Sequence, residues 1–212
     1  MKFPSHGLYA ITQTTNQSIA QVITDVESAL KGGAVVVQYR DKHPLNARHL
    51  ATELVSVCHS YQAPLLINDD VTLALAVGAD GVHLGRDDGD IESARRQLGD
   101  EAIIGVSCYN DIARAKTAIA AGADYVAFGR FFPSGSKPLA APSEVSTLKE
   151  AKKQLKVPIV AIGGILPQNG GNLIDAGADL LAVIGGLFDS PTDPYQAAQL
   201  FQTLFTHRKQ PS

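Results

Sequence analysis

Short apolar runs recur along the chain and alternate with segments whose apolar residues have helical spacing. The runs are rich in valine and isoleucine, which is typical of strands buried on both faces. We expect eight strands, near residues 7–12, 34–40, 64–69, 81–85, 103–107, 125–129, 158–164 and 180–186. The segments between them are mostly helical in pattern, most clearly at 19–30, 46–61, 111–121, 144–155 and 195–205.

Four stretches of the chain resemble one another. Each begins with a Gly-Ala pair after a helical pattern and continues into an apolar run; the pairs start at Gly33, Gly78, Gly122 and Gly177. Strict alternation of strand and helix predicts a parallel sheet with right-handed crossovers. Eight such units favour a single (β/α)8 TIM barrel of the α/β class, with residues 1–212 as one domain. An open, doubly wound sheet is the alternative.

Composition and charge limit the classes of partner that the protein could bind. The chain has 45% hydrophobic and 18% charged residues, an ordinary globular balance. A formal net charge of −3 argues against a general nucleic-acid binder or a binder of anionic membranes. The N-terminus lacks the apolar run of a signal peptide, and no apolar stretch is long enough to span a membrane. We therefore expect a cytoplasmic protein; its oligomeric state, including a homo-oligomer, is left open.

Two cysteines, Cys58 and Cys108, show no metal-ligand spacing and fit free thiols in a reducing compartment. Cys108 follows Ser107 at a strand end, but no histidine stands near it in the strand-end set, so we interpret it as a packing residue. His83 lies within the fourth predicted strand, where a hydrogen-bonded interior residue is a better interpretation than a metal ligand.

Polar side chains gather where the second strand ends. Alternation along the strand puts Gln38, Arg40 and Lys42 on one side. An arginine and a lysine together suit a polyphosphate, since one binds in a bidentate manner and the other supplies a compact charge. Ordinary solvated charges at a strand end are the alternative interpretation.

The third and fourth strands end in acidic residues. Asn68, Asp69 and Asp70 close the third strand, and Asp87 and Asp88 follow the fourth. Neighbouring strand tips with a few oxygen ligands beside a phosphate suit Mg²⁺. Helix capping is the alternative. We favour capping for Asp70 and Asp87, whereas spacing alone does not decide for Asp69 and Asp88.

A long loop follows the sixth strand, at residues 130–142. Its two serines, Ser134 and Ser136, and its lysine, Lys137, fit an anion-binding turn of a mobile lid, although any surface loop can have this composition. Glycine pairs end the last two strands, at Gly163-Gly164 and Gly185-Gly186. Glycine lets backbone N–H groups approach a ligand, and these two loops form the usual phosphate site of a TIM barrel.

In combination, these pieces resemble the thiamine phosphate synthase family over nearly the whole chain. The matching motifs are Gln38-Tyr39-Arg40-Asp41-Lys42, Asn68-Asp69-Asp70, Gly81-Val82-His83-Leu84-Gly85 with Asp88, Ile104-Gly105-Val106-Ser107, Gly122-Ala123-Asp124-Tyr125 leading to Ser134-Gly135-Ser136-Lys137, and Ile162-Gly163-Gly164-Ile165 with Asn169.

The resemblance implies an enzyme that joins hydroxymethylpyrimidine diphosphate to hydroxyethylthiazole phosphate and releases pyrophosphate. The C–O bond breaks first, and the thiazole nitrogen attacks the resulting pyrimidine methyl cation. The implied roles are Mg²⁺ binding by Asp69 and Asp88; diphosphate binding by Gln38, Arg40, Lys42, Asn68 and Lys137; pyrimidine contact by Ser107; and thiazole phosphate binding by the backbone of Gly164, Ile184 and Gly185, with Ser134 and Ser136 close by. Arg40, Lys42, Lys137 and Ser107 would be the catalytic set.

Some positions depart from the family pattern. Serines stand at 134 and 136 where threonine is usual, Gly185 stands where serine is usual, and Tyr109 stands where a histidine is common. Two rivals remain: a non-catalytic sensor of phosphorylated ligands, which the Gly185 and serine changes would motivate, and a thiazole tautomerase on the same barrel, for which a general base is hard to nominate because Tyr109 replaces the histidine. A more distant phosphosugar isomerase would need a glutamate or similar base at a strand end, and none stands there.

Overall fold

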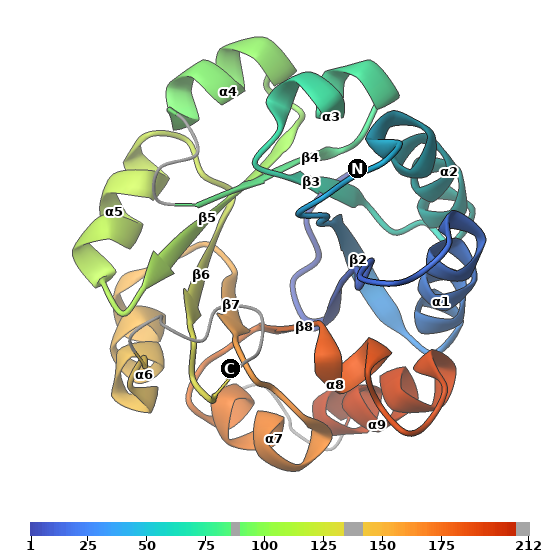
Figure 1. Cartoon of the computed structure of the whole chain (residues 1–212). Helices are drawn as coiled ribbons and strands as arrows, with labels where there is room; N and C mark the ends of the chain where they lie inside the picture. The colour runs from blue at the N-terminus through green and yellow to red at the C-terminus, as the bar shows by residue number, and fades with distance from the viewer. Residues whose placement is uncertain (86–89, 134–141, 207–212) are drawn as a thin grey trace.

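The computed structural model describes residues 1–85, 90–133 and 142–206. Eight parallel strands pair in chain order and close into a barrel, with β1 next to β8. Figure 1 shows these strands surrounded by a ring of helices. The strands are β1 (Gly7–Ile11), β2 (Ala34–Tyr39), β3 (Leu65–Asn68), β4 (Gly81–Leu84), β5 (Ile103–Tyr109), β6 (Tyr125–Gly129), β7 (Ile159–Ile162) and β8 (Leu180–Val183). The closed barrel confirms the predicted (β/α)8 fold and excludes the open sheet.

Helices follow each strand within the described parts of the chain. They are α1 (Ile19–Lys31), α2 (Ala47–Ser60), α3 (Val71–Val77), α4 (Ile91–Leu98), α5 (Ile112–Ala120), α6 (Val145–Gln154), α7 (Pro167–Asp175), α8 (Gly185–Phe188) and α9 (Pro194–Thr206). The five helices with a clear apolar pattern lie within a residue of their predicted ends. The patterns gave no bounds for α3, α4 and α7, which have only seven to nine residues. Among the described residues, no helix is long and apolar enough to cross a membrane.

The last two strands end earlier than their apolar runs predict. β7 stops at Ile162 because Gly163 and Gly164 take positive φ angles of 102° and 63°, which turn the chain out of the sheet. β8 stops at Val183, and the short helix α8 begins at Gly185. The N–H groups of Leu187 and Phe188 donate to the carbonyl of Ile184, so the predicted end of this strand is wrong and its glycines belong to a helical turn.

An aspartate accounts for three of the four repeated stretches. In each, the aspartate lies just before a strand and hydrogen-bonds the first or second residue of the preceding strand. Its backbone N–H donates to that residue's carbonyl, and its Oδ2 accepts from the same residue's N–H at 2.7–2.9 Å. The pairs are Asp80 with Leu65, Asp124 with Ile104 and Asp179 with Ile159. The repeat therefore joins strands β3–β4, β5–β6 and β7–β8 at the amino-terminal end of the barrel.

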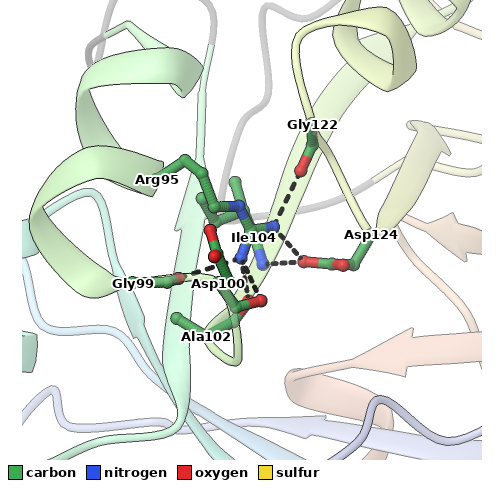
Figure 2. A network of polar contacts seen from close by, with 7 residues as sticks. All are labelled: Arg95, Gly99, Asp100, Ala102, Ile104, Gly122 and Asp124. Atoms are coloured by element: carbon green, nitrogen blue, oxygen red, sulfur yellow. Dashed lines mark hydrogen bonds and ion pairs between the residues drawn. The ribbon is translucent and has the colours of Figure 1, made fainter.

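A basic side chain lies against each of these carboxylates: His59 at Asp80, Arg95 at Asp124 and Lys152 at Asp179. Arg95 makes the largest set of contacts, shown in Figure 2. Its guanidinium also donates to the carbonyls of Gly99, Asp100, Ala102 and Gly122. One side chain of α4 thus connects the loop before β5 with the loop before β6.

The core has two layers, one inside the barrel and one between the barrel and its helices. The interior layer includes Tyr9 and Tyr125, whose side chains are fully buried. Phe3 stacks on Tyr125 with ring centroids 3.9 Å apart and closes this layer on the amino-terminal side. With that end filled, the open space of the barrel lies at the carboxyl ends of the strands.

Candidate active site

A cavity of about 450 Å³ opens at the carboxyl ends of the strands. Its wall combines residues from β2, β3 and β5 with the turns after β7 and β8. It includes eight of the predicted site residues: Gln38, Arg40, Asn68, Asp69, Ser107, Gly164, Ile184 and Gly185. These eight residues span 147 positions of the chain and meet in one cavity, which is the arrangement expected of a TIM-barrel active site.

The other predicted site residues do not line this cavity in the described structure. Lys42 is exposed on an adjoining groove formed by residues 12–19 and 39–43, which we call the side groove. Arg40, Ile184 and Asp189 line both the cavity and the side groove, so the two are continuous. Asp88, Ser134, Ser136 and Lys137 lie outside the described residues, as does Asp87.

Thr12, just past the end of β1, holds the main chain of Arg40. The buried Thr12 hydroxyl accepts from the Arg40 N–H at 2.9 Å and donates to the Arg40 carbonyl at 3.0 Å. The Thr12 N–H in turn donates to the carbonyl of Gln38. These bonds extend the pairing of β1 and β2 beyond the strands and fix where the Arg40 side chain leaves the backbone.

Asp69 lies on the cavity wall in an unusual backbone conformation, with its side chain held by hydrogen bonds. Its φ of 64° lies in the left-handed region, which costs a non-glycine residue about 1–2 kcal/mol. The side chain accepts from the Gly85 N–H at Oδ1 (3.2 Å) and from the Asn68 amide at Oδ2. A strained residue held in this way on a cavity wall indicates a functional site. Asp70 instead accepts from the Leu73 N–H and caps α3, which confirms the capping interpretation.

The turns after β7 and β8 approach other backbone so closely that side chains are excluded. A Cβ on Gly164 would lie 2.3 Å from the Pro133 carbonyl oxygen, and one on Gly186 would lie 2.4 Å from that of Ile165. Gly185 differs from both, because a Cβ there would meet only the Asp189 carboxylate, at 3.0 Å. Gly164 and Gly186 therefore bring backbone without side chains to this side of the cavity.

His83 is buried and hydrogen-bonded, as its position in the fourth strand predicted. Its Nδ1 lies 2.8 Å from the Tyr125 hydroxyl and its Nε2 lies 2.9 Å from the Ser107 hydroxyl. The ring also lines the cavity, which the sequence interpretation missed. Arg114 holds the other side of Ser107 by donating to its carbonyl at 2.9 Å and to that of Gly85 at 3.2 Å.

Cys108 is a packing residue and not a nucleophile. Its side chain is completely buried, and burial raises the pKa of its thiol to about 12, although the charge of Arg114 lowers that pKa. Cys58 is likewise buried, and both cysteines are free thiols. A thiol that keeps its proton at neutral pH is a poor nucleophile.

Sequence reasoning also missed other cavity residues, among them Ile11, Tyr109 and Arg130 at or next to strand ends, and Asp189 after a helix. Arg130 directly follows β6, so the rule that led to Arg40 could have found it. Tyr109 is at the end of β5 with a φ of 57°. Asp189 lies beyond α8 and accepts from the Gln13 amide at 3.3 Å. No local signal marks that contact, because the two residues are 176 positions apart.

Comparison with known proteins assigns this site to a family. The family model described as thiamine monophosphate synthase matches residues 8–187. The chain is 55% identical over 186 residues to the thiamine-phosphate synthase of Nitrosococcus oceani, which covers 87% of this chain and 86% of that protein. It is 49% identical over 200 residues to the enzyme of that name from Thiobacillus denitrificans, covering 93% and 94%.

A solved structure agrees with these matches. Thiamine phosphate pyrophosphorylase from Pyrococcus furiosus superposes with a TM-score of 0.86 at 31% identity, and the alignment covers 96% of each chain. The sequence motifs, the barrel fold and the named relatives all indicate the same family. The chain therefore belongs to the thiamine-phosphate synthase family, a family of transferases of thiamine biosynthesis.

Proposed function

We propose that this chain joins hydroxymethylpyrimidine diphosphate to hydroxyethylthiazole phosphate, giving thiamine phosphate and pyrophosphate. The observation that carries the proposal is the single cavity in which a cationic and acidic wall faces a backbone wall. Arg40, Asn68 and Asp69 stand on the first wall, and Gly164 and Gly185 on the second. Such a cavity can hold a leaving diphosphate on one side and a second phosphate on the other.

The diphosphate half of the site would carry the chemistry. As the C–O bond to the pyrimidine methylene breaks, negative charge develops on the diphosphate. Arg40, with Lys42 and Lys137, would stabilise that charge, and Gln38 and Asn68 would hold the oxygens in place. The bonding electrons leave with pyrophosphate, and the thiazole nitrogen supplies the pair for the new C–N bond. This route requires neither an enzyme nucleophile nor a general base.

The thiazole half would depend on backbone donors. The N–H groups of Gly164, Ile184 and Gly185 would bind the thiazole phosphate, with Ser134 and Ser136 contributing hydroxyls. The close approach of backbone at Gly164 supports this assignment, since only a residue without a side chain fits there. Ser107, on the cavity wall beside His83, would contact the pyrimidine.

Mg²⁺ fits the donor set at the diphosphate half. The Asp69 carboxylate is held in place by Gly85 and Asn68 on the cavity wall, and carboxylate oxygens in small number are what Mg²⁺ takes beside a phosphate. Asp69 and Asp88 would hold the ion. When bound, it would neutralise charge on the diphosphate oxygens.

Turnover by the whole purified chain tests the function. The chain is mixed with hydroxymethylpyrimidine diphosphate and hydroxyethylthiazole phosphate, with Mg²⁺ or with EDTA, and pyrophosphate and thiamine phosphate are both measured. We expect equal amounts of the two products with Mg²⁺ and neither with EDTA. Readdition of Mg²⁺ to the EDTA sample should restore both, which controls for denaturation.

Two other outcomes would overturn the proposal. Binding of thiazole phosphate without release of pyrophosphate would favour a sensor. Rearrangement of a thiazole phosphate isomer without the pyrimidine substrate would favour a tautomerase. Against the tautomerase, Tyr109 stands where a base would be needed, and both ring nitrogens of His83 already have hydrogen-bond partners. The proposal also includes two further points: residues 1–212 form one domain, and the protein is cytoplasmic.

A further inference from the structure

Five polar side chains form one continuous hydrogen-bonded chain across the inside of the barrel. Gln38 Nε2 lies 2.7 Å from the Tyr9 hydroxyl, which lies 2.8 Å from the Tyr125 hydroxyl. Tyr125 is 2.8 Å from His83 Nδ1, and His83 Nε2 is 2.9 Å from Ser107 Oγ. The two ends, Gln38 and Ser107, line the cavity, whereas the two tyrosines are sealed from solvent.

The hydrogen bonds can be given one direction along this series of side chains. A hydroxyl that accepts a hydrogen bond from one neighbour can donate its own hydrogen to the next. The Gln38 amide donates to the Tyr9 hydroxyl, and the direction that then gives both tyrosine hydroxyl protons an acceptor runs from Tyr9 to Tyr125 and from Tyr125 to Nδ1 of His83. A ring nitrogen that accepts carries no proton, so the proton of a neutral His83 is on Nε2 and is donated to Ser107. Burial raises the pKa of both tyrosines, so each keeps the proton that this direction needs.

Packing holds the middle of the chain in place. Phe3 stacks on the Tyr125 ring with the two planes 4° apart. Gly105 leaves room for the same ring, since a Cβ there would lie 1.9 Å from Tyr125 Cζ. At the far end, Arg114 fixes the Ser107 carbonyl. The donors and acceptors therefore have little freedom to rearrange.

We propose that Tyr125 and His83 are positioning residues that make Ser107 a hydrogen-bond donor to the substrate. His83 is held as the tautomer with its proton on Nε2, and this N–H donates to the oxygen of the Ser107 hydroxyl. The hydroxyl proton then points to an unprotonated ring nitrogen of the bound pyrimidine. This rests on the proposed function, which supplies the pyrimidine. The consequence is specificity: an aminopyrimidine with unprotonated ring nitrogens is accepted, and an oxo analogue with a ring N–H is disfavoured.

Nitrogen NMR on the whole chain labelled with ¹⁵N-histidine tests the tautomer directly. His83→Gln identifies the His83 signals by their loss. We expect a pyridine-type Nδ1 and a pyrrole-type Nε2 at neutral pH. The opposite tautomer, or a proton on both nitrogens, would overturn the proposal. This reading needs no turnover, so it can fail while the proposed function stands.

Tyr125→Phe tests the link to catalysis, with Tyr61→Phe as the matched control at an exposed tyrosine outside the cavity. We expect kcat/KM for the pyrimidine diphosphate to fall about 10- to 100-fold, with KM for the thiazole phosphate unchanged. The ¹⁵N signals of His83 should report both tautomers in this variant. Unchanged kcat/KM in a folded Tyr125→Phe chain contradicts the role assigned to Tyr125.

A second pair of variants keeps the test decisive if Tyr125→Phe does not fold. His83→Gln retains an N–H donor on its side chain, whereas His83→Leu retains none. We expect the glutamine variant to keep at least about tenfold more kcat/KM than the leucine variant. Equal loss in the two would mean that His83 only fills space.

Ring analogues test the donor itself. Each of two deaza pyrimidine diphosphates lacks one ring nitrogen and has C–H there instead. We expect wild type to lose about tenfold in kcat/KM on one of them, whereas Ser107→Ala should not distinguish it from the natural substrate. If wild type treats both analogues like the natural substrate, Ser107 does not donate to the ring.

Discussion

At the scale of single residues, Arg40 is a cation whose place on the cavity wall is explained by its backbone contacts. It lies where the cavity meets the side groove, and the Thr12 hydroxyl binds both polar groups of its backbone. A guanidinium whose exit point is fixed loses less freedom when it binds a phosphate than a side chain on a loose loop does.

Arg40→Ala should reduce turnover far more than stability. Loss of one preorganised donor to developing charge lowers kcat by about 10²–10³. Arg48→Ala, an exposed arginine on α2, is the control. Steady-state kinetics and thermal unfolding on both variants check this. Equal kcat in the two folded variants would remove Arg40 from the catalytic set.

Gly185→Ser should strengthen binding of the thiazole phosphate. Backbone does not block a side chain at this position, and only the Asp189 carboxylate must move aside. A serine would add one hydroxyl donor to the phosphate, worth about 1 kcal/mol or about a fivefold lower KM. KM for thiazole phosphate, measured at saturating pyrimidine diphosphate, checks it. Gly186→Ser is the contrast, because its Cβ would collide with the Ile165 carbonyl oxygen and it should lose stability.

At the scale of elements, Arg95 of α4 hydrogen-bonds the loops that precede β5 and β6. Arg95 donates to four carbonyls and to the Asp124 carboxylate, which itself accepts from the Ile104 N–H. The contacts connect β5 and β6 at the end of the barrel opposite the cavity, so they should serve stability and not catalysis (Figure 2).

The variant Arg95→Lys tests whether the contacts of Arg95 serve stability and not catalysis. A lysine keeps the charge but lacks the planar fork, so several carbonyls lose their donor and the free energy of unfolding should fall by about 1–3 kcal/mol. Arg96→Lys, at the exposed neighbouring position, should change it by less than about 0.5 kcal/mol. Urea unfolding measures both. A loss of kcat without a loss of stability in Arg95→Lys would contradict the assignment.

For the whole molecule, buried thiols should make stability sensitive to alkali. Burial raises the pKa of Cys58 to about 12, with Asp80 adding to the effect, and burial raises that of Cys108 to about 12 as well. The unfolded chain loses these protons near pH 9, whereas the folded chain keeps them until about pH 12. The contribution of the thiols to stability is therefore complete below about pH 9 and is lost as the pH rises from about 9 to about 12.

The measurement is the free energy of unfolding in urea at about pH 8 and about pH 10.5. Each thiol should cost on the order of 2 kcal/mol at the higher pH. A Cys58→Ala, Cys108→Ala double variant should therefore lose less stability between the two pH values than wild type does. Parallel losses in the two proteins would show that the thiols are not responsible.

The barrel, and the side of its cavity formed by β2 and β3, could be predicted from the local sequence pattern. Period and repeat predict alternating strands and helices, and the strand-end rule led directly to Gln38, Arg40, Asn68 and Asp69. The pattern of apolar residues gave the wrong secondary structure for the glycines after Val183, which it placed in a strand. An apolar run that ends in glycine is compatible with a strand or a helical turn, and only the bonds to Ile184 decide between them.

What the sequence by itself determined is the order of elements, the class of fold and the kind of side chain at each strand end. Those features depend on neighbours within one or two turns of chain. Only the tertiary structure decided that Thr12 clamps Arg40, that Asp189 lies beside Gly185, and that His83 links two tyrosines to Ser107. These contacts join residues whose separation in sequence carries no signal, because closure of the barrel, and not any local preference, brings them together.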